Sequence, residues 1–237
     1  MRLDHYLSAA GLGSRSEVKK IINKGLVTVD GNTVRDPAFR VPESLAQVVC
    51  DGVLLRYRKN VYFMLNKPQG IISASRSDMR SASELCVVDL IKEEKHRDLF
   101  PVGRLDKDTE GLLIITDDGV LAHDLLSPKK HVDKTYYAEL RGELSEADRA
   151  RIETGIDIGD DTPTLPSRID TINKTSVHIT IHEGRYHQVK RMFEAVGNEV
   201  VFLKRISMGS LSLDTSLRSG EYRELTEDEL SNLRGQN

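Results

Sequence analysis

The sequence has few features of a secreted or membrane-bound protein. It contains only two cysteines, Cys50 and Cys86, and neither has a partner at the spacing of a metal-binding or redox motif. The chain therefore fits a reducing compartment, and we expect it in the cytoplasm. No apolar run approaches the ~18 residues of a membrane span. The opening residues 1–5 contain no apolar core, so we expect neither a signal peptide nor a membrane partner.

The sequence also lacks an excess of positive charge. Its net charge is −3, which argues against a protein that coats nucleic acid by bulk attraction. The charge is unevenly spread, because residues 1–60 contain ten Lys and Arg against six Asp and Glu, and the rest of the chain is correspondingly acidic. This distribution indicates that the N-terminal part meets an anion.

A helix and a β-hairpin are predicted near the N-terminus, after a first short helix. Ser14 and Glu17 have the spacing of a capping box, which starts a helix, and Gly25 ends it. Residues 26–34 then form two apolar runs around a turn at 30–32, which is typical of a hairpin.

The predicted helix has two different faces. Its apolar residues share one side, and its cations spread over the opposite half: Val18, Ile21 and Ile22 on the first, and Arg15, Lys19, Lys20 and Lys24 on the second. These cations form either a solvated helix face or a surface that binds an anion, and the pattern alone leaves both interpretations open.

Strand-like segments dominate the chain from residue 59 onward. The clearest lie at 61–65, 112–116, 135–140, 177–181 and 200–203. Helical patterns are fewer, and the clearest one places Val189, Met192 and Val196 on one face and stops at Gly197. Many strands with few helices predict an α+β fold and not a series of βαβ units. We expect a small domain at 1–58 and a sheet domain at 59–237.

The densest cluster of charged residues lies at 103–111, directly before the apolar run 112–116. In one interpretation, a loop presents Asp106 beside Arg104, and the buried strand that follows fixes its position. In a second, the segment is a calcium loop, because oxygen ligands stand at positions 1, 3, 5 and 12 and a glycine at position 6: Asp106, Asp108, Glu110, Asp117 and Gly111. In a third, it is a polar segment that precedes a β-hairpin and has no functional role. The apolar run and the lack of a flanking helix pair argue against calcium.

The segment 183–191 joins a strand to a helix and contains three cations and a histidine. Helical geometry places Lys190 about 100° from Val189, at the border of the buried face, and turns Arg191 outward. Lys190 is thus the cation best placed to reach an internal site. His187 has no second ligand four residues on, which favours a hydrogen-bonding role over a zinc site.

The segment 134–137, Lys-Thr-Tyr-Tyr, contributes one inward-facing aromatic side chain. Alternation along a strand places Tyr136 on the same side as Ala138 and Leu140, so its ring faces the core or the floor of a cleft. Taken alone, this pattern is typical of a packing residue.

Six strings in a fixed order connect these segments: 1–4 with 27–31, 62–70 (Tyr-Phe-Met-Leu-Asn-Lys-Pro-Gln-Gly), 103–106 (Gly-Arg-Leu-Asp), 134–136 (Lys-Thr-Tyr), 184–192 (Gly-Arg-Tyr-His-Gln-Val-Lys-Arg-Met) and 220–226 (Gly-Glu-Tyr-Arg-Glu-Leu-Thr). In this order they resemble the RsuA family of pseudouridine synthases over nearly the whole chain. The first string resembles an S4 RNA-binding domain, and the others resemble motifs of the catalytic domain.

The resemblance implies a small S4 domain of the αL type followed by a mostly antiparallel, mixed sheet. It implies an enzyme that flips a uridine of 16S ribosomal RNA out of its stack and isomerises it to pseudouridine, expected at uridine 516. Since the reaction adds no group and changes no redox state, neither a cofactor nor a metal is required. The expected partner is 16S rRNA or the assembling small ribosomal subunit, and the expected oligomeric state is a monomer.

The resemblance also implies roles for single residues. Asp106 would start the reaction, either as a nucleophile or as a base that removes a sugar proton. Lys190 would keep it ionised, although Arg191 or Arg185 could take that place. Tyr136 would be the third catalytic residue, which stacks on the flipped base and serves in proton transfer at C5. The residues expected to contact RNA are Arg104, Arg15, Lys19, Lys20, Arg185, His187 and Gln188.

Two other functions fit the same sequence. A sibling synthase that acts on large-subunit rRNA would have the same motifs, because loop contacts select the nucleotide. A non-catalytic S4-type RNA-binding protein of the ribosome would combine the basic N-terminal domain with a second domain that has no catalytic activity. Such a binder has no reason to combine an aspartate, an inward-facing tyrosine and a cation at the edge of a buried face.

Overall fold

The computed structural model describes residues 1–42, 46–55, 57–79, 81, 83–92, 97–127 and 130–235. The chain divides into two compact units, Met1–Val61 with Ile91–Asp98, and Tyr62–Leu90 with Leu99–Asn237. The first unit ends at residue 61, close to the boundary expected at 58, and it includes the segment 91–98, which the sequence did not predict. Arg97 explains this placement, because its guanidinium donates to the carbonyl oxygens of Ala9 and Arg58.

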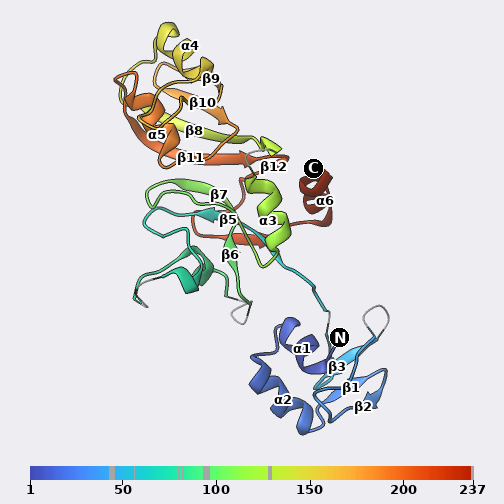
Figure 1. Cartoon of the computed structure of the whole chain (residues 1–237). Helices are drawn as coiled ribbons and strands as arrows, with labels where there is room; N and C mark the ends of the chain where they lie inside the picture. The colour runs from blue at the N-terminus through green and yellow to red at the C-terminus, as the bar shows by residue number, and fades with distance from the viewer. Residues whose placement is uncertain are drawn as a thin grey trace. The chain divides into compact units, whose positions relative to one another are not determined.

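The first unit combines two helices with a four-stranded sheet (Figure 1). Its elements are α1 (Leu3–Ala9), α2 (Arg15–Asn23), β1 (Val27–Val29), β2 (Asn32–Thr33), β3 (Val48–Cys50) and β4 (Val53–Leu55), and the strand order is β2–β1–β3–β4. The predicted capping box is present, since Ser14 accepts the amide of Glu17 and donates its own amide to the Glu17 carboxylate. Leu3, Leu7 and Ile22 lie in the core of this unit.

The predicted hairpin is formed by β1 and β2. Val29 pairs with Asn32, so the turn consists of only two residues, Asp30 and Gly31. Both have left-handed backbone angles, with φ of 49° and 80°. This is the type I′ geometry, which matches the twist of the two strands and explains the Asp-Gly pair.

The second unit is built on a nine-stranded sheet. Its strands are β5 (Tyr62–Lys67), β6 (Phe100–Pro101), β7 (Glu110–Thr116), β8 (Lys134–Leu140), β9 (Arg168–Asn173), β10 (Ser176–Ile181), β11 (Val200–Met208), β12 (Leu211–Ser212) and β13 (Tyr222–Glu224). The main order is β13–β5–β7–β11–β8–β10–β9, with β12 on β11 and β6 on β7. Among the described pairs only β7 and β11 are parallel. The prediction of a mostly antiparallel, mixed sheet in an α+β fold is confirmed.

Helices cover parts of this sheet. They are α3 (Gly119–Leu126), α4 (Glu146–Thr154), α5 (Gln188–Glu194) and α6 (Glu227–Gly235), with short 3-10 turns η1 (Arg76–Asp78) and η2 (Val87–Leu90). In Figure 1, α3 and α6 lie side by side, and Leu121 and Leu233 share one apolar cluster with Leu112 of β7. In the described ranges we find no helix with the length and apolarity needed to cross a membrane.

Gly111 allows the two parallel strands to meet. Its φ is +101°, and a Cβ at this position would lie 2.2 Å from the carbonyl oxygen of Arg205 on β11. Only glycine fits here, since any side chain would push β7 and β11 apart. The loop 103–109, which leads into β7, is thereby held beside Arg205.

Candidate active site

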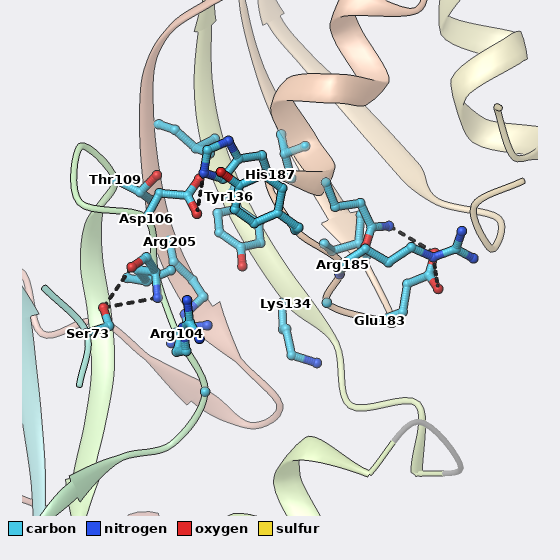
Figure 2. A pocket seen from close by; sticks show the side chains of 18 of the residues that line it. Ser73, Arg104, Asp106, Thr109, Lys134, Tyr136, Glu183, Arg185, His187 and Arg205 are labelled. Carbon is cyan, nitrogen blue, oxygen red and sulfur yellow. Dashed lines mark hydrogen bonds and ion pairs between the residues drawn. The ribbon is translucent and has the colours of Figure 1, made fainter. Parts of the chain in front are cut away.

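A cavity of about 660 Å³ opens in the second unit. It is lined by the loop 103–109, by strands β8 and β11 and by the segment 181–189. The three charged or aromatic segments singled out in the sequence therefore meet in one place. Figure 2 shows Asp106, Tyr136 and His187 close together within the group of lining side chains.

The loop that carries Asp106 is fixed by hydrogen bonds to its backbone. Ser73 donates its hydroxyl to the carbonyl oxygen of Leu105 at 2.8 Å and accepts the amide of Leu105 at 3.1 Å. On the other side, the amide of Thr109 donates to the carbonyl oxygen of Asp106 at 3.1 Å. These hydrogen bonds fix the loop through its backbone and do not involve the carboxylate of Asp106.

Lys67 also fixes this loop, through hydrogen bonds from its ammonium group. It has no exposed surface, and its Nζ lies within 3.3 Å of four backbone carbonyl oxygens, those of Pro68, Asp106, Lys107 and Thr109. Burial lowers the pKa of Lys67 to about 8, against the attraction of nearby carboxylates. This role of Lys67 was not predicted from the sequence. The one local signal was a lysine at the end of an apolar strand.

Two nitrogen-bearing side chains face the carboxylate of Asp106. Lys190 Nζ lies 3.4 Å from its Oδ2, and His187 Nε2 lies 3.5 Å from its Oδ1. Lys190 also donates to Asp108 at 2.6 Å, and this bond lowers the pKa of the Asp108 carboxyl. Lys190 therefore reaches the internal carboxylate, as helical geometry predicted, and shares its charge between two acids.

His187 is held in an unusual backbone conformation. It lies at the N-cap of α5 with φ of 49°, in the left-handed region, which is uncommon for a residue other than glycine. Its ring stacks on Tyr186, with centroids 3.8 Å apart and 17° between the planes. Tyr186 is 73% exposed and lines the pocket, so it offers an aromatic face next to His187. A role for Tyr186 was not predicted from the sequence.

Tyr136 lies on β8 and lines the pocket with a nearly buried side chain. It pairs with Ile179 on β10 and with Arg205 on β11, so all three side chains share one face of the sheet. The expectation of an inward-facing ring at the floor of a cleft agrees with this position.

Arg185 and Gln188 line the pocket but use their polar groups inside the protein. The Arg185 guanidinium donates to Glu183 at 3.0 Å and to the carbonyl oxygens of Thr162 and Pro163. Gln188 is buried and joins the Arg185 amide to the Glu183 carboxylate. We therefore propose that both residues shape the loop, in place of the direct RNA contacts expected from the sequence. Neither is seen to pair with Asp106 in the described part of the chain.

The remaining predicted RNA contacts are exposed. Arg104 is exposed at the pocket, next to the loop residue Leu105. Arg15, Lys19 and Lys20 are exposed on α2 of the first unit, opposite the buried face of that helix.

The calcium-loop interpretation is wrong. Residues 110–116 form the buried strand β7, which at ~3.3 Å per residue carries Asp117 far from Asp106. The nearer carboxylates, Asp106 and Asp108, both face the ammonium group of Lys190. Within the described ranges, no group of three or more His, Cys, Asp and Glu is placed to hold a metal ion.

Comparison with known families matches both units. Residues 61–195 match the model described as RNA pseudouridylate synthase, which covers more than half of the chain, and residues 1–45 match the S4 domain. The chain belongs to the RNA pseudouridylate synthase family. It is thus an enzyme of that family, with an S4 domain at its N-terminus.

Members of this family are similar to it over their whole length. An RNA pseudouridine synthase of Bacillus subtilis (strain 168), YtzG, is 48% identical over 97% of each chain. The ribosomal small subunit pseudouridine synthase A of Escherichia coli (strain K12) is 41% identical over 98% of this chain and 100% of its own. A crystal structure of a pseudouridylate synthase superposes with a TM-score of 0.69 at 36% identity, covering 98% of this chain and 99% of that one.

Proposed function

We propose that this pseudouridine synthase acts on 16S ribosomal RNA, with uridine 516 as its target and Asp106 as the group that starts the reaction. The observation that carries the proposal is the position of Asp106 in the pocket, where it faces Lys190 and His187 beside the buried ring of Tyr136. The relatives named for the small ribosomal subunit, 39% and 41% identical, support the choice of RNA.

The uridine must leave its stack before the reaction can begin. A stacked nucleotide cannot present its C1′ atom to a carboxylate, so we infer that it flips into the pocket, which costs a few kcal/mol. The N1–C1′ bond then breaks, the uracil turns, and C5 bonds to C1′. C5 loses its proton and N1 gains one. The atoms balance with no change of redox state, so the chain's own side chains suffice.

Each pocket residue has a distinct part in this scheme. Asp106 acts in its ionised form, either by adding to C1′ or by removing a sugar proton. Lys190, 3.4 Å away, stabilises that negative charge. Tyr136 stacks on the uracil and holds it during the turn. Arg104, exposed at the pocket, contacts the RNA backbone or fills the gap that the flipped base leaves.

The target is tested directly with purified full-length protein. It is incubated with 16S and 23S rRNA transcripts and with small ribosomal subunits, and pseudouridines are mapped by carbodiimide modification and reverse transcription. We expect one new pseudouridine, in 16S rRNA. A new pseudouridine in 23S rRNA alone would identify a large-subunit enzyme, and none in any of the three RNAs would contradict the proposal.

Two substitutions of Lys190 test the role of its positive charge, because one removes the charge and the other keeps it. We expect Lys190→Met to lower kcat about 10- to 100-fold, because Asp106 loses its nearest cation. Lys190→Arg keeps the charge and should stay within about threefold of the wild type. Single-turnover rates on the mapped RNA substrate measure both.

Asp108→Asn is the matched control for the shared lysine. Asp108 is mostly exposed, so its ion pair contributes little, and we expect less than about a threefold change in kcat. If Asp108→Asn were as damaging as Lys190→Met, the lysine would act through Asp108 and not through Asp106.

Neutralising the α2 cations tests the S4 unit as an RNA-binding surface. For Arg15→Gln, Lys19→Gln and Lys20→Gln combined, we expect about 10- to 100-fold weaker RNA binding. The slope of the logarithm of the binding constant against the logarithm of the salt concentration should become shallower by about 2–3. The three side chains are exposed, so the folded structure should persist. Affinity is measured by filter binding at several salt concentrations.

A second triple variant makes the same charge change elsewhere. Arg151, Lys174 and Arg168 are exposed on the catalytic unit and do not line the pocket. Their replacement by Gln should leave the salt dependence almost unchanged. Equal losses in both triple variants would mean that α2 carries only a solvated face.

A further inference from the structure

Two buried cations lie at the pocket without a role in the scheme above. Lys134 is on β8 and Arg205 is on β11, and both line the cavity. Lys134 is 8% exposed and Arg205 is 2% exposed. Residues of this kind are almost never fully buried unless they are paired, so their position calls for a physical reason.

The hydrogen bonds of these two side chains are incomplete. Lys134 Nζ donates to the carbonyl oxygen of Val132 at 2.9 Å, and Arg205 Nε donates to that of Leu112 at 2.8 Å. An ammonium has three donors and a guanidinium has five. Arg205 Nη2 is buried and has no acceptor among the residues that the structure describes. A structural role thus uses only part of what these groups offer.

Their charges are also uncompensated. In the described part of the chain, no carboxylate forms an ion pair with either side chain, and the pocket acids Asp106 and Glu183 are paired with other cations. Burial and the neighbouring Arg205 together lower the pKa of Lys134 to about 8, although the attraction of Asp133 opposes them in part. Two like charges held together in a buried site destabilise the fold unless an anion joins them.

RNA offers one kind of anion at neutral pH, the phosphodiester group, because uracil and ribose are neutral. In the view of Figure 2, Asp106 and His187 lie to one side of Tyr136, and Arg104 and Lys134 lie to the other. Lys134 and Arg205 line the same cavity as Asp106 and Tyr136, so a nucleotide with its sugar at Asp106 would bring a flanking phosphate into the cavity that these two cations line.

We propose that Lys134 and Arg205 form a phosphodiester subsite that holds the RNA backbone next to the flipped uridine. This rests on the proposed function, since it takes RNA as the substrate. The bound phosphate supplies the acceptor and the negative charge that the two side chains lack. It also anchors the extruded nucleotide, so that the base cannot return to its stack while the glycosidic bond is broken.

A neutral backbone linkage tests the subsite without changing the protein. 16S rRNA is assembled by splinted ligation with a methylphosphonate at either linkage that flanks the mapped uridine. We expect one of these positions to lower the wild-type kcat/KM about 10- to 100-fold. Lys134→Met should lower kcat/KM on natural RNA by a similar factor, and the neutral linkage should then add less than about a twofold loss. Arg205→Met should show the same loss of sensitivity.

A control on the same strand uses the opposite face of β11. Lys204 neighbours Arg205 but does not line the pocket, so Lys204→Met should keep the full sensitivity to the neutral linkage. The subsite is overturned if neither methylphosphonate linkage lowers the kcat/KM of the wild type. It is also overturned if the neutral linkage lowers kcat/KM by the same factor in Lys134→Met and in the wild type. Failure of the proposed function looks different, because natural RNA would then gain no pseudouridine with the wild type.

A measurement without RNA keeps the subsite testable in that case. Inorganic phosphate, compared with chloride at equal ionic strength, should raise the unfolding temperature of the wild type by a few degrees. It should raise that of Lys134→Met and Arg205→Met much less. In chloride, Lys134→Met should be at least as stable as the wild type, because a buried unpaired charge is gone. Equal phosphate effects in all three proteins would contradict the subsite.

Discussion

Asp106→Asn is expected to lower the rate of pseudouridine formation by more than about 10⁴-fold while RNA affinity changes less than about threefold. Asparagine has nearly the same shape, so the loop bonds through Ser73 and Lys67 stay in place. What is lost is the negative oxygen that adds to C1′ or removes a proton. The measurement combines single-turnover kinetics with filter binding on the mapped RNA.

Asp108→Asn is the internal control for this result. It makes the same chemical change two residues away, in the same loop, at a carboxylate that is mostly exposed. A rate near the wild type for Asp106→Asn, or equal losses for the two variants, would remove Asp106 from the role that we give it.

Lys67→Met is expected to have the largest effect on folding. Four backbone carbonyl oxygens lose their donor, and three of them belong to the loop that carries Asp106. Buried acceptors left without a donor destabilise a protein, and we expect a loss of about 2–4 kcal/mol in the free energy of unfolding. Urea denaturation followed by circular dichroism measures this change.

The same variant should also be slow when it is fully folded. At low temperature and without denaturant, we expect kcat at least about 10-fold below the wild type, because the loop no longer fixes the Asp106 carboxylate. Lys107→Met is the control, since Lys107 is exposed in the same loop and also lines the pocket. Normal kcat and normal stability in Lys67→Met would show that the loop is held by other bonds.

Local features of the fold were predictable because their causes are local. The Ser14–Glu17 capping box starts α2, and the Asp30-Gly31 turn forms the hairpin, each through contacts within a few residues. Alternation placed Tyr136 inward, and helical geometry placed Lys190 toward the pocket. These inferences needed only the period of a strand or a helix.

The rest of the site depends on contacts between distant residues, which periodicity does not reveal. Lys67 bonds carbonyl oxygens about 40 positions away, and Arg205 bonds one on β7, 93 positions away. Gly111 is required by the backbone of β11, and only the parallel pairing with that strand explains it. The bonds of Arg185 and Gln188 to Glu183 and to the backbone, which lead us to propose a structural role for both, could not be read from the sequence.

We propose that this chain makes one pseudouridine in 16S rRNA through Asp106. The most direct measurement maps pseudouridines in rRNA from a strain that lacks the gene, complemented either with the wild type or with Asp106→Asn. We predict that one position of 16S rRNA loses its pseudouridine, that the wild type restores it, and that Asp106→Asn does not. An unchanged 16S profile in the deletion strain, or restoration by Asp106→Asn, would contradict the account.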